Sequence, residues 1–83
     1  MEFELSKHAT ESLLERQIQL KWIAKTFSQP QKVESDRLDI NLEHRLLRIE
    51  EFDGRILRVI INKSLTPPRI VTAYFVRGMK NRL

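Results

Sequence analysis

The sequence contains no cysteine. This absence excludes disulfide bonds, a thiolate nucleophile and a zinc site built from thiolates. Glycine and proline are also scarce, with two and three residues in a chain of 83. The rest is balanced, since 41% of the residues are hydrophobic and 31% are charged. This composition excludes collagen, low-complexity sequence and compositional disorder, and it is typical of a folded globular protein.

Long apolar runs are absent as well. No purely apolar run approaches the ~20 residues that a membrane-spanning helix needs. The chain starts with the acidic segment Met1–Glu4, whereas a secretory signal starts with basic residues and continues with apolar ones. We therefore expect a cytoplasmic protein. The length suits a single domain, residues 1–83, with one small core.

Acidic side chains are missing from the last third of the chain. Residues 1–54 hold 8 basic and 11 acidic side chains, a balance of −3. Residues 55–83 hold 7 basic and no acidic side chains, a balance of +7, so that the whole chain carries +4. Such a segment favours contact with a polyanion or an acidic protein. The alternative is a solvated basic sheet edge that deters aggregation.

The first half of the sequence has the apolar spacing of helices. Phe3–Leu5 alternates like a short strand, and Ser6 is a suitable N-cap for a helix over residues 7–16. Apolar residues at i, i+3, i+4 and i+7 predict a second helix over residues 19–27, which Pro30 terminates. A helical hairpin is therefore expected.

The second half has the spacing of strands. Asp53-Gly54 is a strong hairpin signal, and residues 66–68 form a proline turn. Residues 37–42 are ambiguous and are interpreted as a loop. The predicted strands cover residues 32–36, 44–52, 55–63 and 69–77. The fold class is therefore α+β, with two N-terminal helices packed on one face of a twisted, mainly antiparallel sheet of three to five strands.

Strand parity separates the two faces of this sheet, because alternate side chains point to opposite sides. We expect two apolar triplets under the helices: Leu57, Val59 and Ile61, and Val71, Ala73 and Phe75. The opposite parity places Arg58, Thr72 and Tyr74 together on the other face, with Ile56, Ile60, Ile70 and Val76 as apolar neighbours.

Several motifs in order resemble a known family. They are Ser6-Lys7-His8-Ala9, Glu15-Arg16-Gln17-Ile18, Pro30, Arg55-Ile56-Leu57-Arg58-Val59-Ile60 and Val71-Thr72-Ala73-Tyr74-Phe75. This pattern resembles a family of small bacterial proteins with a domain of unknown function, considered distant relatives of the BrnT and RelE toxins. The resemblance implies a helical N-terminus on an antiparallel sheet. It also implies metal-independent cleavage of RNA, held in check by a small acidic antitoxin.

Metal-independent RNA cleavage sets chemical requirements that the residues can be tested against. The 2′-hydroxyl attacks the adjacent phosphate, so a base, an acid and cations for the phosphorane are needed. His8 lies in the first turn of the first helix, where the helix dipole favours a bound phosphate. The candidate catalytic residues are His8, Arg58, Tyr74 and Arg16. The candidate RNA- or phosphate-binding residues are Arg48, Arg55, Thr72, Arg77 and Lys80. Neither a metal nor another cofactor is expected.

Structural interpretations compete with each of these roles. His8 can pack at the start of its helix, Arg16 can join a helix end to the sheet, and His44 is more often structural or solvated. The leading function is a toxin-type endoribonuclease acting on RNA, including mRNA on the ribosome. The alternative is a non-catalytic basic module that binds a small acidic protein or RNA. A homodimer is a further way to cover the face that carries Tyr74.

Overall fold

The computed structural model describes residues 2–78 and 83. It contains two α-helices and a five-stranded mixed sheet, which confirms the predicted α+β class. The elements in chain order are β1 (Glu4–Leu5), α1 (Lys7–Arg16), α2 (Leu20–Ser28), β2 (Lys32–Ser35), β3 (Leu42–Ile49), the 3-10 helix η1 (Glu50–Phe52), β4 (Arg55–Asn62) and β5 (Arg69–Val76).

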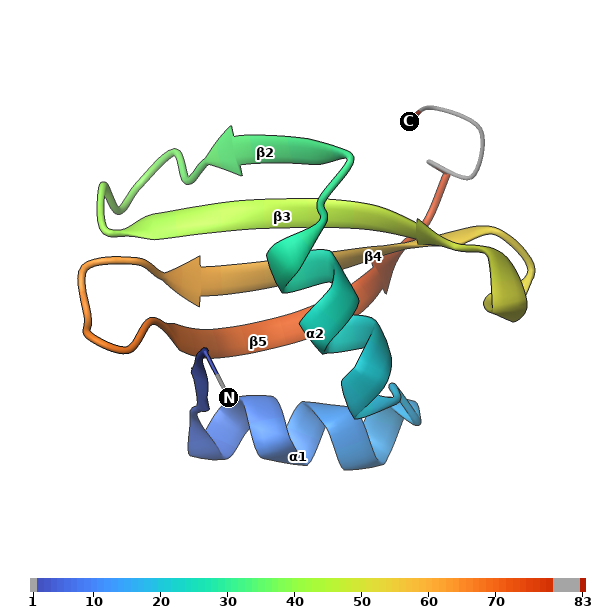
Figure 1. The fold of residues 1–83 in the computed structure, drawn as a ribbon, viewed down its shortest axis with the longest axis horizontal. Coiled ribbons are helices and arrows are strands. Elements are labelled where there is room, and N and C mark those ends of the chain that lie inside the picture. The colour runs from blue at the N-terminus through green and yellow to red at the C-terminus, as the bar shows by residue number, and fades with distance from the viewer. Residues whose placement is uncertain (1, 79–82) are drawn as a thin grey trace.

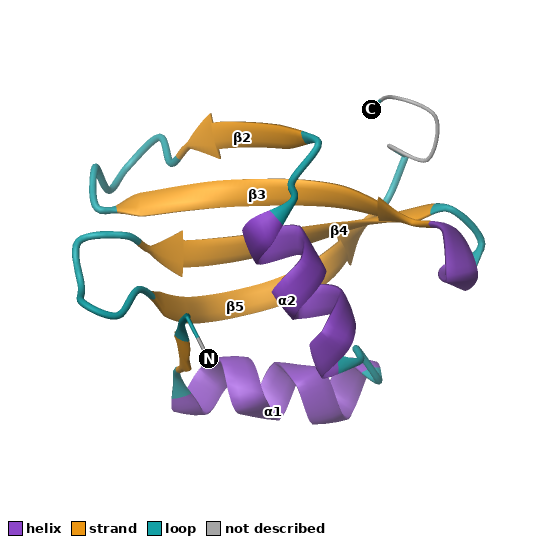
Figure 2. Cartoon of the chain, in the orientation of Figure 1, coloured by secondary structure: helices purple, strands orange, loops and turns teal. Residues whose placement is uncertain are grey.

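The strands are ordered β1-β5-β4-β3-β2. Strands β2 to β5 form an antiparallel meander, whereas β1 joins β5 in parallel through a two-residue pairing. Figure 1 shows α2 crossing the sheet and α1 running alongside β5, and Figure 2 colours the same elements as helices, strands and loops. Both helices contribute to one core cluster with the sheet, so they cover the same face.

Helix α1 begins where Ser6 can cap it. The Ser6 hydroxyl accepts a hydrogen bond from the Ala9 amide at 3.0 Å and donates one to the Val71 carbonyl at 3.0 Å. The cap therefore also fastens the start of α1 to β5. The helix ends at Gln17, whose φ of 55° is in the left-handed region.

The core lies between the helices and the sheet. Leu57, Val59, Ile61 and Ala73 are buried there, and Phe75 packs against them, as the strand parity predicted. The helices contribute Ala9, Trp22, Ile23 and Phe27 to the same cluster, and Ile18 joins it from the connection between α1 and α2.

An irregularity in the pairing of β4 and β5 reverses the predicted parity at one end of β5. The register runs from Ile60 opposite Thr72 directly to Ile61 opposite Ile70, so Val71 is an extra residue. Ile70 is consequently fully buried in the core, and Val71 is only partly buried. The prediction that Val71 faces the helices and Ile70 the other side was wrong, because the bulge exchanges their places.

The β3–β4 connection also differs from the prediction. Strand β3 starts two residues earlier than expected and ends at Ile49, where η1 takes over. Asp53 and Gly54 follow with φ of 58° and 65°, so the predicted turn is present but is preceded by a helical turn. Among the described residues, no helix is long and apolar enough to cross a membrane.

Candidate functional site

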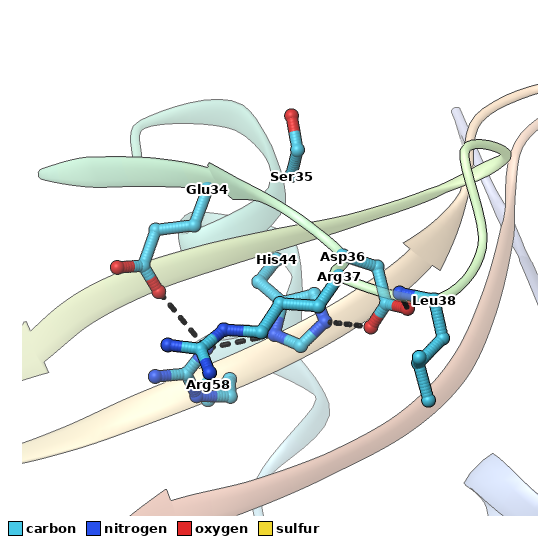
Figure 3. Close-up of a pocket in the computed structure, with 7 residues that line it drawn as sticks. All are labelled: Glu34, Ser35, Asp36, Arg37, Leu38, His44 and Arg58. Atoms are coloured by element: carbon cyan, nitrogen blue, oxygen red, sulfur yellow. Dashed lines mark hydrogen bonds and ion pairs between the residues drawn. The ribbon is translucent and has the colours of Figure 1, made fainter.

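A polar cluster occupies the face of the sheet opposite the helices, which we call the outer face. It consists of Glu34 on β2, Asp36 just after β2, His44 on β3 and Arg58 on β4. The register brings them together, because Glu34 lies opposite His44 and strands β3 and β4 are paired along their full length. Figure 3 shows the four side chains converging from these elements.

Hydrogen bonds join the cluster into one chain. Arg58 Nη1 donates to Glu34 Oε1 at 3.1 Å and lies 2.7 Å from His44 Nδ1. His44 Nε2 lies 2.7 Å from Asp36 Oδ1. Because a guanidinium group only donates, Nδ1 must accept from Arg58. Nε2 therefore carries the ring proton and donates a hydrogen bond to Asp36, which fixes the tautomer of the neutral imidazole.

Asp36 is held as a carboxylate. The hydrogen bond from His44 lowers the pKa of Asp36 below its ordinary value of 3.8. The backbone amides of Leu38 and Asp39, each 3.0 Å from Oδ2, lower the pKa further. The carboxylate thus uses one oxygen to organise its own loop and the other to orient the imidazole.

Glu34 is also held in its charged form. Partial burial raises the pKa of Glu34, but hydrogen bonds and the positive charges of Arg58 and Lys32 outweigh this effect and leave it lowered. The Lys32 ammonium lies 3.4 Å from Glu34 Oε2. Glu34 is therefore the anion that occupies Arg58 in this structure.

Arg58 and His44 are well packed for polar residues. Their side chains are 16% and 15% exposed. Leu46 lies directly opposite Arg58 in the register and is fully buried, although it belongs to the outer face. An arginine stem can cover such an apolar neighbour while its charged end remains accessible. This packing limits the positions that the guanidinium can adopt.

The cluster forms one side of an open hollow of about 580 Å³. Leu38, from the loop after β2, borders this hollow and is 98% exposed. A histidine oriented by a carboxylate can exchange protons, and an adjacent arginine can bind a phosphate. The lining residues are Glu34, Ser35, Asp36, Arg37, Leu38, His44 and Arg58.

The structure brings several predicted site residues together. Arg58 lies directly opposite Tyr74, and Thr72 lies opposite Ile60, so the predicted outer-face group is confirmed. Three more predicted site residues, Arg16, Arg55 and Arg77, share a second hollow with Tyr74. The complete lining of this hollow is Arg16, Phe52, Arg55, Tyr74, Phe75 and Arg77. Ile56, predicted as an apolar neighbour on this face, is fully buried.

Other predicted residues lie elsewhere. His8 is exposed on α1, in the helical layer, and the sheet separates that layer from the outer face. His8 is thus not part of the cluster around Arg58, and its predicted catalytic role stays a prediction. Arg48 lies opposite Ile56 and 3.9 Å from Glu50. Lys80 lies outside the described residues.

The sequence interpretation undervalued His44 and did not select Glu34 or Asp36. The position of Glu34 beside His44 could have been predicted, since strands over residues 32–36 and from residue 44 onward were both expected. Pairing them across a short loop places Glu34 near His44. The bond to Asp36 was not accessible in this way, because it depends on the conformation of the loop. Within residues 2–78 and 83, no three His, Cys, Asp or Glu side chains gather as a metal site.

Residues 5–75 match the family model described as Domain of unknown function (DUF4258). The chain belongs to the DUF4258 family. The match spans the whole cluster from Glu34 to Arg58, and it confirms the resemblance to a small family of unknown function. Comparisons of this DUF4258 chain with curated proteins and with solved structures found no match. The relation to the BrnT and RelE toxins stays a prediction.

Proposed function

We propose that this DUF4258 chain is the toxin of a type II toxin–antitoxin pair, a metal-independent endoribonuclease that acts on RNA in the cytoplasm. One observation carries the proposal: His44 is oriented by Asp36 and lies next to Arg58 at an open hollow. This arrangement combines a proton acceptor with a side chain that can bind a phosphate. Attack by a 2′-hydroxyl on the adjacent phosphate needs both groups.

Phosphate binding would uncover the base. In the structure, Arg58 is bound to Glu34 and covers the Nδ1 lone pair of His44. A phosphodiester in the hollow competes with Glu34 for the guanidinium, which binds phosphate oxygens through paired donors. As Arg58 turns to the phosphate, Nδ1 becomes available to the ribose. Substrate binding and activation of the base are thereby coupled.

The chemical step is an internal transfer at phosphorus. The 2′-oxygen forms a bond to phosphorus while His44 Nδ1 takes the hydroxyl proton. The bond from phosphorus to the 5′-oxygen breaks, and that oxygen takes a proton from the Tyr74 phenol. Tyr74 suits this role because it lies opposite Arg58. The products are a 2′,3′-cyclic phosphate and a 5′-hydroxyl, and transfer of the proton from His44 to Tyr74 through solvent restores the enzyme.

Asp36 acts as a positioning residue in this scheme. Its bond to Nε2 keeps the other ring nitrogen directed toward Arg58. When Nδ1 is protonated, the carboxylate stabilises the positive imidazolium. This is the role that buried carboxylates have beside catalytic histidines in other hydrolytic sites.

The partner in this proposal is a small acidic antitoxin. Support comes from the last 29 residues, 55–83, which contain seven basic and no acidic side chains. An acidic protein would be attracted to this segment and would compete with RNA for the same arginines.

One observation favours the alternative, a non-catalytic interaction module. The polar atoms of the cluster satisfy one another, since Nδ1 and Nε2 of His44 both have partners. In this alternative, the sole role of the hydrogen-bonded cluster is to hold β2, β3 and β4 together. The two functions differ in whether RNA is cut.

The test is cleavage of a labelled RNA oligonucleotide by the purified chain in the presence of a chelator. We expect His44→Gln to lower the rate by about 10²-fold or more, the usual contribution of a general base. We expect His8→Ala to retain the rate. Products are checked for cyclic phosphate and 5′-hydroxyl ends, and circular dichroism checks that both variants fold.

Two results would contradict the proposal. Absence of cleavage by the folded wild-type chain, with and without ribosomes, would favour the interaction module. Loss of cleavage in His8→Ala but not in His44→Gln would remove the cluster from catalysis and return the role to the first helix.

A further inference from the structure

A second hollow of about 260 Å³ lies at the end of β5. It is formed by residues from separate elements: Arg16 ends α1, Arg55 begins β4, and Tyr74 lies on β5. Three of the six lining residues are arginines and none is acidic. The complete lining is Arg16, Phe52, Arg55, Tyr74, Phe75 and Arg77. The hollow therefore has the charge of an anion site.

Two of these arginines are held in place by the fold. Arg16 Nη1 donates to the Ala73 carbonyl at 3.1 Å. The Arg55 guanidinium carbon lies 5.2 Å and 5.0 Å from the ring centroids of Phe52 and Phe75. An arginine has five N–H donors in a plane, so one carbonyl contact or a stacked ring leaves donors for a phosphate. The two side chains are thus held in position and still have N–H donors for a ligand.

Tyr74 connects this hollow with the cluster around His44. It lines the second hollow and also lies directly opposite Arg58, at the short distance of paired residues on adjacent strands. Phe75 belongs to the helix side of the sheet and Arg58 to the outer face, so a strand of RNA with one phosphate at Arg58 would reach the second hollow by passing over Tyr74 and round the edge of β5, where β1 pairs only with Arg69 and Ile70. Aromatic rings in such positions stack on unpaired bases.

We propose that the second hollow is a subsite for the nucleotide next to the cleaved phosphate. Arg55 and Arg77 bind its phosphate, Arg16 adds a further donor, and Tyr74 stacks on a base. The identity of the ligand as single-stranded RNA rests on the proposed function. An acidic protein segment is the competing ligand class. RNA fits better because the arginines share this hollow with Tyr74, the register partner of Arg58, and a carboxylate ligand has no use for an aromatic ring.

The experiment measures binding of a fluorescent 2′-O-methyl RNA oligonucleotide, which cannot be cleaved by 2′-hydroxyl attack. We expect the double variant Arg55→Gln/Arg77→Gln to weaken binding by about tenfold or more, since charge-assisted hydrogen bonds to phosphate are lost. Tyr74→Leu should weaken binding, while Tyr74→Phe, which keeps the ring, should not. Arg69→Gln is the matched control, because Arg69 is an exposed arginine at the other end of β5.

The outcomes separate the subsite from the catalytic proposal. Binding that depends on Arg55, Arg77 and the Tyr74 ring supports the subsite even if natural RNA is never cut, which would overturn only the ribonuclease. Equal losses in the Arg77→Gln and Arg69→Gln single variants would overturn the subsite, because charge alone would then explain binding. Absence of binding by the wild-type chain would overturn it too. Competition by polyglutamate that requires the same arginines, without RNA binding, would assign the hollow to an acidic protein.

Discussion

At the scale of single residues, Arg58 decides how the cluster can work. It donates to Glu34 and to His44 at the same time, so a neutral imidazole and a carboxylate share one cation. Sequence parity was sufficient to place Arg58 and Tyr74 on one face, because side chains alternate strictly along regular strands. It was not sufficient to pair Asp36 with His44, since Asp36 lies beyond the end of β2, where alternation no longer applies.

The lowered pKa of Asp36 predicts how stability changes in acid. A carboxyl group whose pKa is lower in the folded chain stabilises it above the ordinary value of 3.8, and this contribution disappears as the pH falls through the lower folded value. We expect wild-type stability to drop below about pH 4, the ordinary range of aspartate. Asp36→Asn should be less stable than the wild type at pH 7 and should respond less to acid.

Urea unfolding from pH 7 down to strongly acidic pH measures this difference. Glu11→Gln is the control, since Glu11 is an exposed residue of α1. The two unfolding midpoints, wild type and Asp36→Asn, should converge in acid. Curves that stay parallel over the whole range would mean that the bond from His44 contributes nothing to folding.

At the scale of elements, α1 and β5 form one unit. The helix is fastened to the strand by Ser6 at its start and by Arg16 at its end, through the carbonyls of Val71 and Ala73. The helix boundaries could be predicted closely because a capping serine and apolar spacing are local signals. The bulge at Val71 could not, because it depends on how two strands fit each other across the sheet.

This double use of Ser6 predicts an unusually costly cap substitution. Ser6→Ala removes both the bond from the Ala9 amide and the bond to Val71. We expect a loss of about 2 kcal/mol in the free energy of unfolding, the upper part of the range for N-caps. Chemical denaturation measures the change.

Thr10→Ala is the matched control for Ser6→Ala. The Thr10 hydroxyl donates to the Ser6 carbonyl on the exposed side of the same helix. We expect a change within about 0.5 kcal/mol, as for most surface substitutions. Similar losses for both variants would show that the contact between Ser6 and β5 has no stabilising role beyond the helix itself.

At the scale of the whole molecule, the structure shows where the basic residues of the last third of the sequence lie. Arg55, Arg58 and Arg77 come from the segment without acidic residues. Arg58 lines the hollow beside His44, and Arg55 and Arg77 line the second hollow. The composition could predict a basic surface, but it could not predict that carboxylates of the acidic half would reach this surface. Glu34 does so, because the sheet places β2 two strands away from β4.

The location of charge predicts the salt dependence of RNA binding. For single-stranded nucleic acid, log K falls with log salt by about 0.7 for each phosphate neutralised. If Arg58 neutralises one phosphate and the second hollow one or two, the slope for a 2′-O-methyl RNA oligonucleotide should be about −1.4 to −2.1. Arg58→Gln should reduce its magnitude by about 0.7, the contribution of one phosphate, whereas Arg69→Gln should leave it unchanged. If every arginine substitution lowered the slope equally, the net charge of +4 would be responsible, and the two hollows would have no special part in binding.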